Sequence, residues 1–193
     1  MPFNPLPEFY CDDNGDYISV DFDFDFESEL SDDPDWLHKI KHRVGSIVIE
    51  FNPLEKEIED QILDIMNERA EDSRIWVFLE NMPASRKINS LFQIYDRMFE
   101  HCDVKDATKA TAKDLNQRIN TLNSKRNLYV HANWLNTVDE LVEHRTRRLK
   151  TGTYGRIRKK ITLAEIDADI MAMEKMRFEL SEYHYEAVQE MLG

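Results

Sequence analysis

One stretch of the chain, residues 124–134, holds three side chains that together suit the handling of a phosphate group. Arg126 is a permanent cation, Asn127 carries a carboxamide, and His131 carries an imidazole that titrates near neutral pH. The apolar residues before the stretch recur at spacings of four and three, which predicts a helix: Leu115, Ile119 and Leu122. If this helix continues, Asn127 and His131 lie one turn apart on one face, and Arg126 lies one position off that face.

The spacing of these residues does not by itself establish a site. The predicted last helix contains a second arginine–histidine pair, Arg177 and His184. In the alternative interpretation, Arg126 forms a cap or a salt bridge on the helix surface, and His131 packs against Trp134. Both interpretations stay open from the residue types alone.

Charge is distributed unevenly along the chain. The net charge is −13, but residues 1–40 hold twelve acidic residues against one lysine, a net −11, so the remaining 153 residues carry −2. Residues 145–160 contain no acidic residue and eight basic ones: Arg145, Arg147, Arg148, Lys150, Arg156, Arg158, Lys159 and Lys160. This basic segment is a candidate RNA-binding surface, with Tyr154 available to stack on a base. The alternative is a solvated basic face that balances the acidic N-terminus.

Residues 1–33 are predicted to form an acidic N-terminal extension, irregular over residues 1–16. From Tyr17 to Phe26 apolar and acidic residues alternate, which is typical of a half-buried strand. One interpretation is an edge strand on this protein's own sheet. The other is an acidic docking segment that covers a basic surface.

Residues 34–193 are predicted to form an all-α domain, an antiparallel helical bundle. The expected helices cover 35–70, with a kink or restart at Pro53, then 85–102, 108–133 and 162–191, and residues 75–79 form a brief helix or turn. In the 85–102 helix, Lys87 is expected to face water with its charged neighbours. A basic β-hairpin insertion is predicted at about 140–161, and Thr162 and Glu165 form a capping-box pattern that opens the last helix.

Several classes of protein find no support in the sequence. Five scattered glycines form no phosphate-binding loop, and Cys11 and Cys102 lack metal-ligand spacing, so no metal and no cofactor is expected. No apolar run is long enough to span a bilayer. We therefore expect a cytoplasmic protein with reduced thiols and no membrane partner.

The motif and its context resemble the HEPN superfamily. The carrying residues are Arg126 with a polar residue directly after it and His131 a turn later, an R-N-x3-H pattern in a long helix. Upstream, Val44–Glu55 is similar to the glycine-to-"LE" segment of the first helix in bacterial HEPN-like proteins, and Ser85–Leu91 is similar to the lysine-bearing start of their second helix. The resemblance covers residues 36–191 and excludes the acidic extension.

This resemblance implies a metal-independent endoribonuclease with its site in a cleft between two protomers. Its implied biological role is that of a toxin or a phage-defence effector. RNA cleavage through the 2′-hydroxyl needs a base and an acid on opposite sides of phosphorus, and two His131 side chains in a homodimer would divide these tasks. Arg126 would neutralise the phosphorane oxygens, and Asn127 would orient His131 or the phosphate.

The expected partners are RNA and a second copy of the chain, with an antitoxin or another protein as a further partner. The main alternative function is a non-catalytic HEPN-like module that dimerises and binds a nucleotide or a protein. A third alternative is an acidic decoy whose aspartates imitate a nucleic-acid backbone.

Overall fold

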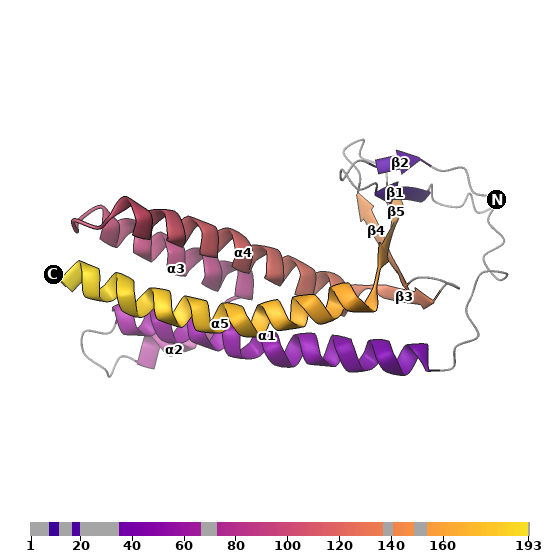
Figure 1. Cartoon of the computed structure of the whole chain (residues 1–193), viewed down its shortest axis with the longest axis horizontal. Coiled ribbons are helices and arrows are strands. Elements are labelled where there is room, and N and C mark those ends of the chain that lie inside the picture. The colour runs from indigo at the N-terminus through magenta and orange to yellow at the C-terminus, as the bar shows by residue number, and fades with distance from the viewer. Residues whose placement is uncertain are drawn as a thin grey trace. The chain divides into compact units, whose positions relative to one another are not determined.

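The computed structural model describes residues 8–11, 17–19, 35–66, 73–136, 141–148 and 154–192 (Figure 1). The chain divides into two compact units. The sheet unit contains residues 1–44 and 128–168, and the helical unit contains residues 45–127 and 169–193. No helix in the described ranges has both the length and the apolar character needed to cross a membrane.

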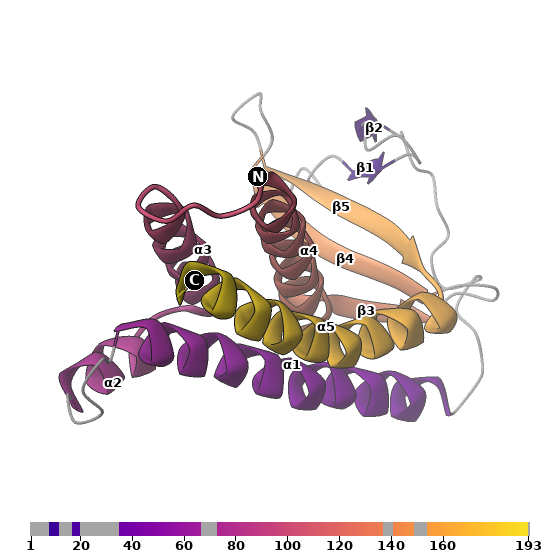
Figure 2. The same ribbon diagram turned by 60° about the vertical axis from the view of Figure 1, so that its left-hand side comes forward.

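The chain is predominantly helical, as predicted. The helices are α1 (Trp36–Met66), α2 (Ser73–Glu80), α3 (Ala84–Phe99), α4 (Asp106–His131) and α5 (Leu163–Leu192). In the helical unit α1 runs beside α5, and α3 runs beside α4 (Figure 2). The core contains side chains with no exposed surface from four helices: Ile47, Phe51, Leu54, Ile58, Ile88, Leu91, Tyr95, Ile119, Met173 and Leu180. Each large apolar side chain buried in this way contributes about 1.5–3 kcal/mol.

α1 continues through Pro53, where we expected a kink or a restart. Proline in a helix interior removes one backbone hydrogen bond and costs about 3 kcal/mol. Phe51 and Leu54 on either side of Pro53 are both completely buried. Their packing offsets the cost, because a break at this point would expose one or both of them.

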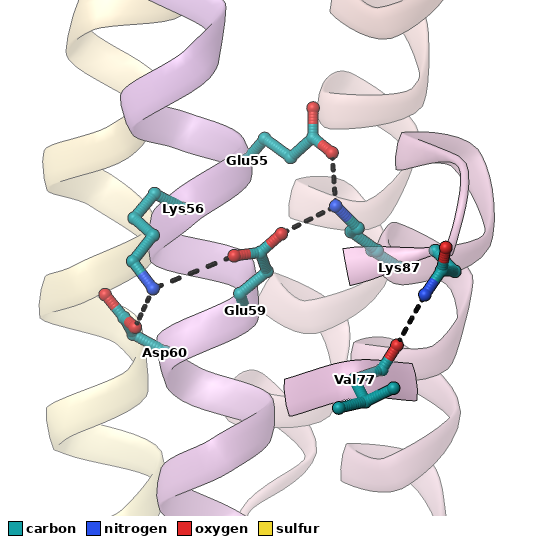
Figure 3. A network of polar contacts seen from close by, with 7 residues as sticks. Glu55, Lys56, Glu59, Asp60, Val77 and Lys87 are labelled. Atoms are coloured by element: carbon teal, nitrogen blue, oxygen red, sulfur yellow. Dashed lines mark hydrogen bonds and ion pairs between the residues drawn. The ribbon is translucent and has the colours of Figure 1, made fainter. Parts of the chain in front are cut away.

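The prediction that Lys87 faces water is wrong. Lys87 is 5% exposed, and its Nζ lies 2.5 Å from Glu55 Oε1 and 2.6 Å from Glu59 Oε1 (Figure 3). Burial alone would lower the pKa of Lys87, but the hydrogen bonds and the negative charges of Glu55 and Glu59 together outweigh burial and raise the pKa. The lysine is therefore a charged link between α3 and α1.

The sheet unit contains a five-stranded sheet in the order β2-β1-β5-β4-β3. Its strands are β1 (Glu8–Cys11), β2 (Tyr17–Ser19), β3 (Asn133–Asn136), β4 (Leu141–Arg148) and β5 (Tyr154–Ile161). β1 pairs in parallel with β5, and the other neighbours are antiparallel.

Two sequence predictions are corrected by this sheet. Residues 8–11 form β1, although we expected residues 1–16 to be irregular, because their partner β5 comes from the other end of the chain. α4 ends at His131, and Asn133, which we placed in the helix, begins β3. Of the predicted strand at 17–26, residues 20–26 lie outside the described residues.

A capping box and an ion pair fix the first turns of α5, which belong to the sheet unit. The predicted capping box is confirmed, since Glu165 N donates to Thr162 Oγ1 at 3.1 Å and Thr162 N donates to Glu165 Oε2 at 2.6 Å. Arg43 of α1 donates through Nε and Nη2 to both carboxylate oxygens of Asp167, at 2.8 and 2.9 Å. A bidentate pair of this kind fixes direction as well as distance.

We predict that Lys87→Met lowers the free energy of unfolding by about 2 kcal/mol. A fully buried pair would lose about 3–5 kcal/mol, but Glu55 and Glu59 keep partial contact with water. Because folding raises the pKa of Lys87, its contribution persists below the unfolded pKa and is lost only as pH rises through the folded pKa. Urea unfolding followed by circular dichroism measures the effect.

The matched control for this prediction is Arg86→Met, which removes an exposed cation next in sequence and should change stability by less than about 0.5 kcal/mol. Adding Glu55→Gln and Glu59→Gln to Lys87→Met should recover much of the lost free energy of unfolding, because no carboxylate is then left without its cation. Equal losses in the Lys87 and Arg86 variants would contradict a structural role for this link.

Candidate functional site

Arg126, near the C-terminal end of α4, is held by two contacts within the helical unit. Its Nη1 donates a hydrogen bond to Asn127 Oδ1 at 2.9 Å. Its guanidinium carbon lies 5.8 Å from the ring centroid of Phe51, a fully buried residue of α1. The hydrogen bond and the cation–π contact restrict the orientation of the guanidinium group before any ligand arrives.

One atom of this guanidinium and one atom of Asn123 are buried without a hydrogen-bond partner among the described residues. They are Arg126 Nε, a donor, and Asn123 Oδ1, an acceptor, three positions apart on α4. A buried group left unpaired costs about 1–3 kcal/mol. Because both atoms are buried, a ligand that approaches from solvent does not reach them in this structure.

A salt bridge fixes α4 at the level of Arg126. Lys125 Nζ lies 2.6 Å from Asp169 Oδ1 of α5, and Asp169 is 7% exposed. Because Lys125 directly precedes Arg126, this pair and the Phe51 contact anchor neighbouring residues to two different helices. The backbone that carries Arg126 is thereby held on two sides.

His131 is the last residue of α4, and its side chain is exposed. Trp134, which our alternative interpretation placed against His131, donates from Nε1 to the backbone oxygen of Tyr129 at 3.1 Å. The two aromatic rings stack with centroids 6.0 Å apart and an interplanar angle of 24°. These contacts fix the chain on both sides of an imidazole that solvent can reach.

The predicted site residues are divided between the two units, whose boundary falls between Asn127 and Leu128. Arg126 and Asn127 belong to the helical unit, and His131 belongs to the sheet unit. Of the predicted RNA-binding residues, Lys150 lies outside the described residues. The others lie in β4 and β5: Arg145, Arg147, Arg148, Tyr154, Arg156, Arg158, Lys159 and Lys160.

Strand register connects the basic strands to the end of α4. β3 begins two residues after His131, and Asn133 is the backbone partner of His144 in β4. Arg145 follows His144 directly, and Tyr154 is paired with Arg148. Sequence reasoning did not single out His144, because its pairing with the segment after His131 appears only once the strands are aligned.

The second arginine–histidine pair has a different environment. His184 Nδ1 lies 2.6 Å from the Tyr95 hydroxyl, and His184 Nε2 lies 2.9 Å from Asp64 Oδ2. The Tyr95 hydroxyl is also 3.2 Å from Gln61 Oε1, and Tyr95 is completely buried. Burial raises the pKa of Tyr95, so its hydroxyl remains protonated. This network joins α1, α3 and α5, which makes His184 a structural residue.

The described residues offer no clustered metal ligands. They contain no group of three or more histidine, cysteine, aspartate or glutamate side chains placed to hold a metal ion.

We predict that Tyr95→Phe lowers the free energy of unfolding by about 1–3 kcal/mol, because it removes the hydroxyl shared by Gln61 and His184. Tyr185→Phe is the matched control, since Tyr185 is 68% exposed and should tolerate the change within about 0.5 kcal/mol. Chemical denaturation measures both. If Tyr95→Phe is as stable as the wild type, the network does not hold the helices together.

The chain has no match among protein-family models, curated proteins or solved structures. Residue types, contacts and charge are therefore what support a function for it.

Proposed function

We propose that this protein is a metal-independent endoribonuclease of HEPN type that acts through Arg126 and His131. The observation that carries the proposal is the R-N-x3-H pattern on α4, with an oriented arginine and an exposed histidine. Arg126 supplies a permanent positive charge that can pair with a phosphate oxygen. A cytoplasmic toxin or phage-defence effector is the biological role that the resemblance implies.

In the proposed reaction, the 2′-hydroxyl of RNA attacks the adjacent phosphorus and the 5′-oxygen leaves. One His131 takes the proton of the 2′-hydroxyl, and the His131 of a second copy gives a proton to the leaving oxygen. Arg126 stabilises the charge that builds on the phosphorane oxygens. Asn127, already bonded to Arg126 Nη1, positions that guanidinium. The products are a 2′,3′-cyclic phosphate and a 5′-hydroxyl.

RNA would bind along the basic strands β4 and β5. Seven of the eight basic residues between 145 and 160 lie in these two strands, and Tyr154 begins β5. His131 and both strands belong to the same unit. A positively charged pair of strands next in sequence to the proposed acid–base residue fits a path for the RNA backbone.

The second candidate is a non-catalytic module that binds another protein. The observation in its favour is a groove in the helical unit, walled by α2 and α3 and lined by eight apolar and five polar residues. A groove of this kind requires neither Arg126 nor His131. An RNA-cleavage assay therefore distinguishes the two candidate functions, because only the endoribonuclease would cleave RNA.

We predict that wild-type protein cleaves structured RNA in EDTA and that His131→Ala and Arg126→Ala each reduce cleavage by at least a hundredfold. Loss of a preorganised charge donor typically costs about 2.7–4 kcal/mol in the transition state. His101→Ala is the matched control, because His101 is also exposed but lies outside the motif. Equal activity of the His131 and His101 variants would contradict the assignment.

We also predict that replacing Arg145 and Arg147 with glutamine weakens RNA binding and flattens its salt dependence. Each phosphate contact that is lost should reduce the slope of log K against log salt by about one. Arg97 and Lys105, exposed cations of the helical unit, provide the control substitutions. An unchanged salt slope in the strand variant would place the RNA elsewhere on the protein.

A further inference from the structure

We propose that the groove between α2 and α3 binds an amphipathic helix of another protein, with basic residues bordering its apolar face. The groove has a volume of about 1040 Å³ and reaches the last turns of α1. That volume lies at the upper end of the range typical of small-molecule pockets, and a helix laid along a groove accounts for it better. The proposal is independent of RNA cleavage by Arg126 and His131.

Contacts with the core and with α1, and a hydrogen bond at its end, fix α2 as a wall of this groove. Leu79 is 2% exposed, so it anchors α2 in the core. Lys56 Nζ of α1 lies 3.8 Å from the ring centroid of Trp76, and the same Nζ lies 2.9 Å from Asp60 Oδ1, also of α1. Asn81 Nδ2 donates to the backbone oxygen of Val77 at 2.8 Å, which caps the end of the helix (Figure 3). α2 is therefore held in place without any partner.

The outer side of α2 remains apolar and exposed. Val77 is 62% exposed and Phe78 is 67% exposed, although the helix has only eight residues. Neighbouring exposed apolar side chains of this size mark interaction surfaces in soluble proteins. Phe78 lines the groove, together with three methionines from different segments: Met66, Met82 and Met98. Methionine side chains adapt to the shape of a helix laid against them.

The charges at the rim favour a basic partner. Asp96 and Glu100 line the groove, and Glu80 follows Leu79 with its side chain exposed. Arg97 also lines the groove, and its Nη1 lies 3.0 Å from Glu100 Oε2, so these two charges offset each other and Asp96 leaves the lining with one net negative charge. The described part of the helical unit contains 18 acidic and 13 basic residues. The same groove of a second copy would bring like charge, whereas a basic helix complements the negative charge.

The test uses full-length protein and a fluorescein-labelled designed helix of about 18 residues, or five turns. The helix carries leucines at helical spacing bordered by lysines, and fluorescence anisotropy measures its binding. We expect a micromolar dissociation constant that rises with salt. A peptide with the same leucines bordered by glutamates should bind at least tenfold more weakly.

Phe78→Asp should weaken binding of the lysine-bordered helix by at least tenfold. The matched control is Phe178→Asp on α5, since Phe178 is 57% exposed and lies outside the groove. The affinity of this variant for the lysine-bordered helix should stay within twofold of wild type. Far-UV circular dichroism confirms that both variants fold. Equal binding by the two variants, or equal binding of the two peptides, overturns the proposal. So does a wild-type homodimer in sedimentation that Phe78→Asp dissociates, because a second copy would then occupy the groove.

Discussion

The continuity of α1 through Pro53 is the constraint on which the rest of the helical unit depends. One uninterrupted helix presents Phe51 to Arg126 of α4, Glu55 and Glu59 to Lys87 of α3, and Asp64 to His184 of α5. A change of helical phase at Pro53 would rotate the residues after it relative to Phe51. The burial of Phe51 and Leu54 on both sides of the proline therefore also preserves the contacts of α1 with α3, α4 and α5.

The proposed site takes its geometry from this helix. Arg126 is flanked by Lys125, which bonds to Asp169 of α5, and lies over Phe51 of α1, so two helices hold the segment that carries it. His131 is held differently, by the stacking of Tyr129 and Trp134 on either side of it in the chain. Arg126 is thus oriented by a packed core, whereas His131 is exposed to solvent.

The sequence predicted the features that depend on residues three or four positions apart. Ile88, Leu91 and Tyr95 of α3 are buried as their spacing indicates, and Thr162 and Glu165 form the capping box that their types indicate. The sequence did not predict β1, because its partner β5 lies far away along the chain. Lys87 was placed on the surface because its two carboxylate partners belong to another helix. The residue types of the candidate site were readable from the sequence, whereas the contact of Arg126 with Phe51 and the register of His144 opposite Asn133 required the tertiary structure.

The proposed reaction cleaves RNA through the substrate's own 2′-hydroxyl. The most direct measurement compares one defined RNA with the same RNA carrying 2′-O-methyl groups, both incubated with wild-type protein in EDTA. We predict that the unmodified RNA is cleaved to products with 2′,3′-cyclic phosphate ends and that the methylated RNA remains intact. Cleavage of both RNAs, or of neither, would contradict the account.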